Sequence, residues 1–90
     1  MLIFNLFIDI ALYLENRYIE NMEYTIAFSW DDEASVWVAE CPDIPGLILE
    51  SGSFDALVER VKIAVPDLLE LDRTEQVKLR FKAERLAVVA

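Results

Sequence analysis

A change of hydrophobic period at Met22 constrains the fold of this chain more than any other feature of its sequence. Before it, four polar residues recur at helical spacing on a largely apolar segment: Asn5, Asp9, Asn16 and Glu20. After it, apolar residues alternate with small or polar ones from Tyr24 to Trp30, as in a strand with one buried face. We therefore predict an N-terminal apolar helix over residues 1–21 and a domain over residues 22–90.

The first part of that domain has the pattern of a hairpin followed by a third strand. β-branched and aromatic residues are frequent in residues 22–30 and 35–40, and the acidic segment 31–34 separates them. Residues 41–46 contain two prolines and a glycine, which is typical of a turn. We expect a hairpin with an acidic tip, then this turn, then a third strand over residues 47–50.

A helix and a fourth strand are expected next. Ser53 can cap a helix, and six apolar residues behind it recur at helical spacing: Leu57, Val58, Val61, Ala64, Val65 and Leu68. Pro66 interrupts this pattern, so the helix either kinks there or ends before it, with a second short helix over residues 66–71. Alternation over residues 76–83 predicts a fourth strand with a basic outer face, and residues 86–89 either prolong it or begin another.

These elements predict an α+β fold in which an antiparallel sheet of three to four strands carries one main helix on a face. The N-terminal helix has a narrow polar stripe and must bury most of its surface. We expect Phe4, Phe7 and Ile8 to pack in an oligomer interface. An unpaired strand edge is a second reason to expect a dimer or a larger homo-oligomer.

Composition excludes several classes of function. The 90 residues include eight Lys and Arg against seventeen Asp and Glu, which gives a net charge of −9. Such a chain repels phosphate backbones, so we expect no direct binding to nucleic acid. It has no His and a single cysteine, which excludes a Ser-His or Cys-His relay. We expect no enzymatic activity, no metal and no cofactor.

The sequence also predicts a cytoplasmic protein without a membrane span. The apolar run from Leu2 to Leu14 carries Asn5 and Asp9 and is shorter than the roughly 18 to 20 residues that a span needs. It lacks the charged start and the cleavage site of a secretory signal. A lone cysteine cannot form an intramolecular disulfide, which fits a reducing compartment.

Three features have both a chemical and a structural interpretation. The acidic run 31–33 could hold a divalent metal, but consecutive side chains in a tight turn diverge, so we favour a solvated hairpin tip. Cys41 could be a nucleophile, but no basic residue lies near it in sequence, so we favour a small, buried or half-buried apolar role. Trp30 and Trp37 could stack on a ligand, but we favour a cross-strand pair.

Charge is unevenly distributed along the chain. Residues 22–72 contain twelve acidic side chains against two basic ones, whereas residues 73–90 contain five basic side chains against two acidic ones. An acidic body suits a cationic protein partner, and a basic strand could dock on the acidic body of a second copy. The alternative is that both are merely solubilising faces.

The order of the short motifs resembles the HicB-like antitoxin domains, especially their small stand-alone relatives of unknown function. The resemblance covers about residues 22–81, and its motifs are YTIAF at 24–28, DDE at 31–33, VWVA at 36–39, PDIPGL at 42–47 and ESGS at 50–53. It implies a reduced ribonuclease-H-like β-β-β-α-β arrangement without catalytic acids. It also implies that residues 1–21 are either an over-called start or an added helix.

The resemblance further implies a non-catalytic antitoxin-type protein that occludes a small, basic, RNA-cleaving toxin of the HicA type. Family members that bind their operator use a second, C-terminal domain, for which 90 residues leave no room, so operator binding is not expected. The alternative is a homo-oligomeric structural protein without a surviving toxin partner. From the acidic excess we assign these partner-binding residues: Asp31, Asp32, Glu33, Glu40, Asp43 and Glu50. We assign three basic residues to an oligomer interface: Lys78, Arg80 and Lys82.

Overall fold

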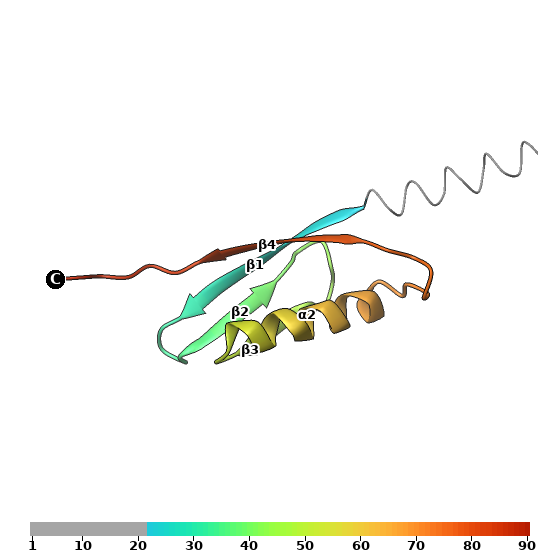
Figure 1. Ribbon diagram of the computed structural model, residues 1–90. Helices are drawn as coiled ribbons and strands as arrows, with labels where there is room; N and C mark the ends of the chain where they lie inside the picture. Colours follow the sequence, from blue (N-terminus) through green and yellow to red (C-terminus); the bar gives the residue numbers. More distant parts are fainter. Residues whose placement is uncertain (1–21) are drawn as a thin grey trace, which may run out of the picture.

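The computed structural model describes residues 22–90, which form a four-stranded sheet with one helix packed on it (Figure 1). The elements in chain order are β1 (Glu23–Asp31), β2 (Val36–Glu40), β3 (Ile48–Ser51), α2 (Phe54–Leu68) and β4 (Lys78–Glu84). The assignment of residues 1–21 to a helix, and of Phe4, Phe7 and Ile8 to an interface, lies outside the described residues. Within residues 22–90, no helix is long and apolar enough to cross a membrane.

The strand order is β3-β2-β1-β4, so the hairpin occupies the centre of the sheet. β1 pairs antiparallel with β2, and β2 pairs antiparallel with β3. β4 pairs with β1 in the parallel direction, with Glu23 opposite Lys78 and Ser29 opposite Glu84. The α+β fold with one helix on a sheet is thus confirmed. The sheet is mixed, because α2 carries the chain back to the end at which β1 begins.

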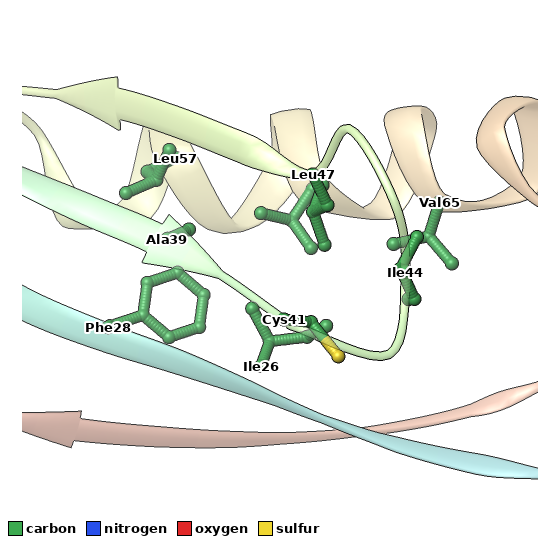
Figure 2. Close-up of a cluster of buried hydrophobic side chains, with 9 residues drawn as sticks. Ile26, Phe28, Ala39, Cys41, Ile44, Leu47, Leu57 and Val65 are labelled. Atoms are coloured by element: carbon green, nitrogen blue, oxygen red, sulfur yellow. The ribbon is translucent and has the colours of Figure 1, made fainter.

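The core lies between α2 and the sheet. Alternation along β1 directs Ile26 and Phe28 toward the helix, and Ala39 of β2 lies beside Phe28 in register. The buried cluster, drawn in Figure 2, consists of Ile26, Phe28, Ala39, Cys41, Ile44, Leu47, Leu57, Val61 and Val65. Three of these come from α2 at the helical spacing expected from the sequence.

The turn between β2 and β3 closes one end of this core. The Ile44 amide donates to the Cys41 carbonyl at 3.0 Å, and the Leu47 amide donates to the Ile44 carbonyl at 3.1 Å. These two turns direct Ile44 and Leu47 inward, and Figure 2 shows Ile44 beside Val65 of α2. Gly46 has φ +87°, a conformation that favours glycine. The PDIPGL motif is therefore a folding element that joins the sheet to the helix.

The structure decides between the two alternatives left open at Pro66. The helix continues through Pro66 to Leu68 and does not end before it, and no second short helix forms over residues 66–71. The missing Pro66 N–H removes only one helical bond near the last turn, and the Leu69 amide still donates to the Val65 carbonyl at 3.0 Å.

Residues 86–89 neither prolong β4 nor form another strand. The reason is that β1 ends at Asp31, only two residues beyond the pair that Ser29 makes with Glu84. Past that point, the rest of the described chain offers this segment no neighbouring strand.

Candidate interaction surfaces

The six acidic residues assigned to partner binding are exposed, and the sheet divides them into two groups. Asp31, Asp32 and Glu33 occupy the turn between β1 and β2, which we call the acidic tip. Glu40 and Glu50 lie on the sheet face opposite α2, which we call the open face, because their neighbours Ala39 and Leu49 point toward the helix. Asp43 lies beyond Glu40, in the turn between β2 and β3.

The acidic tip is braced by its own carboxylates. Asp31 Oδ1 accepts hydrogen bonds from the amides of Glu33, at 3.0 Å, and Ala34, at 3.2 Å. Asp32 Oδ1 accepts from the indole nitrogen of Trp30 at 2.8 Å. Two of the three carboxylates therefore hold the shape of the turn, and that shape presents three negative charges at the end of the sheet.

Within residues 22–90, no three Cys, Asp or Glu side chains are grouped so that they could hold a metal ion. The acidic tip lies at the end of the sheet where the chain passes from β1 to β2, and Glu40 lies at the opposite end of β2.

Glu40 and Glu50 are neighbours on the open face. Glu40 lies opposite Ile48 in the β2–β3 register, and Glu50 lies opposite Val38, so the two carboxylates are diagonal partners. They make the β3 side of the open face acidic, and Asp43 adds a further exposed carboxylate in the turn beyond Glu40.

The β4 side of the same face is basic. Lys78, Arg80 and Lys82 alternate with residues that point to the helix side. Arg80 Nε donates to Glu23 Oε1 at 2.7 Å, which joins β4 to β1 across the parallel pair. Between the two sides, β1 contributes uncharged residues at positions 25, 27 and 29. The open face is therefore acidic toward one edge and basic toward the other.

The sequence of residues 23–90 matches the family described as "Domain of unknown function (DUF1902)". The chain belongs to the DUF1902 family. The matched region begins at the first residue of β1, directly after the change of hydrophobic period at Met22. It contains every described strand, the helix and both groups of acidic residues.

One solved structure is similar in both sequence and fold. It is the crystal structure of a hypothetical protein from the extremely thermophilic bacterium Thermus thermophilus, with 37% identity and a TM-score of 0.61. The similarity covers 74% of this chain and 99% of the thermophile chain. No protein in a search of curated sequences matches.

The single cysteine of this DUF1902 chain has the structural role predicted for it. Cys41 is buried, and Figure 2 shows it beside Ile26 at the edge of the core. Trp30 and Trp37 form the predicted cross-strand pair, with ring centroids 5.6 Å apart in an edge-on arrangement. The ring of Trp37 also lies 5.1 Å from that of Phe54, so the pair continues into the helix.

Sequence reasoning missed a contact between the end of β1 and the residue that follows β4. The Arg85 guanidinium lies over the Trp30 ring, 4.0 Å from its centroid, which is a cation–π contact. A hollow of about 560 Å³ opens beside it, lined by Trp30, Asp32, Arg85, Leu86, Ala87 and Val88. The sequence carries no signal for this contact, because it depends on the parallel register of β4.

Proposed function

We propose that this DUF1902 protein is a non-catalytic, HicB-like antitoxin-type module that binds and occludes a basic HicA-like RNA-cleaving toxin. The observation that carries the proposal is that all six assigned acidic side chains are exposed: three on the acidic tip, two on the open face and one in the turn after β2. A toxin that cleaves RNA presents a cationic surface to phosphate groups. An acidic protein competes with RNA for that cationic surface of the toxin, because their charges are complementary.

The braced geometry of the tip supports this function. A turn fixed by Asp31 and Asp32 presents its charges without further ordering when a partner arrives, which lowers the cost of binding. Exposed charges of this kind mainly raise the rate of association, and their effect is screened over about 8 Å at physiological ionic strength. In this proposal the protein acts in the cytoplasm, where its thiol stays reduced.

The experiment measures inhibition of RNA cleavage by a purified HicA-type protein, together with the association rate at several salt concentrations. The variant D31N/D32N/E33Q removes three charges and keeps oxygen acceptors at Asp31 and Asp32, so the turn retains its hydrogen bonds. We expect the association rate to fall on the order of tenfold at low salt, with a smaller change in dissociation. The reversal D31K/D32K/E33K should have a larger effect in the same direction.

A matched control neutralises three acidic residues of α2 and its C-terminal end: E59Q/D67N/E70Q. These side chains are exposed, as those of the acidic tip are. The control removes the same three negative charges as D31N/D32N/E33Q but leaves both acidic groups of the sheet unchanged. E40Q/E50Q tests the open-face pair separately. The proposal fails if the full chain does not inhibit cleavage, if binding ignores both salt and the tip variants, or if the control slows association as much as they do.

A second candidate function is a homo-oligomeric scaffold without a toxin partner. The exposed apolar residues after β4 favour self-association, since Leu86, Val88 and Val89 are almost fully accessible. Tight, sequence-specific binding of duplex DNA by the isolated chain would count against the toxin-binding proposal. It would indicate that the basic side of the open face reads nucleic acid.

A further inference from the structure

β4 is an edge strand whose free side can accept another strand. It pairs with β1 alone among the described elements. The Lys78 amide donates to the Met22 carbonyl at 3.0 Å, so Lys78 and every second residue after it bond toward β1. Leu79, Phe81 and Ala83 therefore direct their N–H and C=O groups to the free side. An exposed edge of this length is a template for pairing with a further chain.

The segment that follows β4 is apolar and almost entirely exposed. Leu86, Val88 and Val89 expose 92%, 93% and 87% of their surface. Figure 1 shows this C-terminal segment running on beyond the sheet in the direction of β4. Phe81, at the same edge, is also more than one-third exposed on the helix side. Such a row of apolar side chains along one edge marks an interaction site.

We propose that two copies of this chain pair antiparallel along β4 and residues 85–89, with the twofold axis passing through Ala83. The occupant is a second copy because the edge is complementary to itself in this register. A twofold axis perpendicular to the sheet places each residue opposite a residue on the same face of the sheet. The charged residues of β4, which share the open face, therefore lie opposite open-face residues of the second copy. Around Ala83, Lys82 of each copy lies opposite Glu84 of the other.

Neighbouring registers are less favourable. An axis at Lys82 places two Lys82 side chains opposite each other, and an axis at Glu84 does the same with two Glu84 side chains. Like charges directly opposite one another on a strand pair are destabilising, whereas opposite charges contribute to pairing. An axis at Phe81 places Lys82 opposite Arg80 twice. Of these four registers, only the axis at Ala83 pairs opposite charges without opposing like ones.

The same register accommodates the apolar segment. It places Leu86 opposite Arg80 and Val88 opposite Lys78, where the aliphatic stems of the long basic side chains cover them. Residues 86–88 thereby gain the neighbouring strand that residues 22–90 of one chain do not offer them. The backbone agrees, since Ala83 already directs both of its polar groups to the free side and can exchange two hydrogen bonds with its copy.

This inference does not depend on the proposed toxin binding, and the experiment uses the full chain alone. Light scattering measures the mass of K82E, of E84K and of their equimolar mixture. Each single variant places like charges at two positions, so we expect its assembly mass to halve and its dissociation constant to rise at least tenfold. In the mixture, the two acidic side chains of the K82E chain face the two basic side chains of the E84K chain, and we expect the original mass to return.

The matched control pair is E59K and K62E on the exposed side of α2. These two residues of α2 form an ion pair at 2.9 Å, and α2 packs mainly on β2 and β3. The substitutions change the net charge by the same amounts. Both should keep the assembly mass of the native chain. If they lower it as much as the β4 variants do, general charge and not the register controls assembly, and the proposal fails.

A disulfide trap tests the register directly. In the proposed pair the two Ala83 Cα atoms lie about 5.5 Å apart, within the range for a disulfide. With oxidised glutathione, A83C should form a covalent dimer. R85C should not, because position 85 lies opposite Phe81 of the second copy and so is four residues away from position 85 of that copy. Cross-linking of R85C in preference to A83C would overturn the register. Native mass for both single charge variants would overturn the interface itself.

Discussion

Trp30 contacts three different segments of this small domain: the turn after β1, strand β2 and the end of β4. Its indole N–H donates to Asp32, its ring packs edge-on against Trp37, and Arg85 lies over its face. The pairing with Trp37 follows from alternation in a hairpin and could be predicted from sequence. The contacts with Asp32 and Arg85 could not, because they depend on the detailed turn geometry and on where the chain leaves β4.

Asp72 provides a titration test of the link between α2 and β4. Its Oδ1 accepts from the Thr74 hydroxyl at 2.7 Å and from the Thr74 amide at 2.8 Å, and these bonds hold the pKa of Asp72 below its ordinary value. Thr74→Val removes the hydroxyl donor, so we expect the pKa of Asp72 to rise toward that value while the amide keeps part of the shift. Carboxyl carbon chemical shifts followed by NMR during acid titration measure it.

The sign of the accompanying stability change follows from linkage. The folded-state pKa of Asp72 lies below its unfolded-state pKa, so the carboxylate contributes stability above the unfolded-state pKa. That contribution is lost as the pH falls through the folded-state pKa. Thr25→Val, on the open face of β1, is the control and should leave the titration of Asp72 unchanged. An unchanged pKa in Thr74→Val would contradict the assigned hydrogen bond.

At the scale of elements, local sequence patterns predicted the features that depend on neighbouring residues, such as the hairpin and the helix cap. Alternation indicated the hairpin, and Ser53 caps α2 by accepting from the Ala56 amide at 3.2 Å, as expected for an N-cap serine. Of the two alternatives left open at Pro66, the helix end before it is wrong, because a proline near a helix C-terminus removes only one bond. The parallel direction of β4 was not predictable from alternation, which is the same for strands that run either way.

Gly46 allows a prediction about the turn between β2 and β3. Its φ is +87°, and a Cβ added there would lie 3.4 Å from Leu68 Cδ2. Gly46→Ala should therefore lower the free energy of unfolding by about 1–2 kcal/mol, measured by urea denaturation. Gly52→Ala is a matched control, because its Cβ would meet only the Ser35 carbonyl oxygen at 3.9 Å. Equal losses in both variants would show that the left-handed conformation of Gly46 is not what restricts this position.

At the scale of the whole molecule, the two proposed interfaces are only partly separate. Glu40 and Glu50 lie toward β3, and the self-complementary edge is β4, at the other side of the sheet. The acidic tip lies between the central strands β1 and β2, and its Asp32 lines the same hollow as Arg85 and Leu86. The exposure of Glu40, Glu50 and the basic residues of β4 was predictable, because charged residues alternate with apolar ones along these strands. Their separation into an acidic side and a basic side was not, because it depends on the strand order. A partner that binds Glu40 and Glu50 therefore leaves the β4 edge free for a second copy, whereas a partner on the acidic tip lies beside residues 85–88.

The described residues should form a folded domain without residues 1–21. All nine core residues of the described chain lie between Ile26 and Val65, and the partly buried shell extends only from Tyr24 to Leu79. A chain that begins at Met22 should unfold cooperatively on heating, followed by circular dichroism, and should retain the β4-edge dimer.

The assignment of Phe4, Phe7 and Ile8 to a separate oligomer interface predicts that the full chain forms larger assemblies than this shorter one, which light scattering resolves. Equal assembly masses would show that residues 1–21 contribute no such interface. Loss of the cooperative transition would instead show that those residues complete the core.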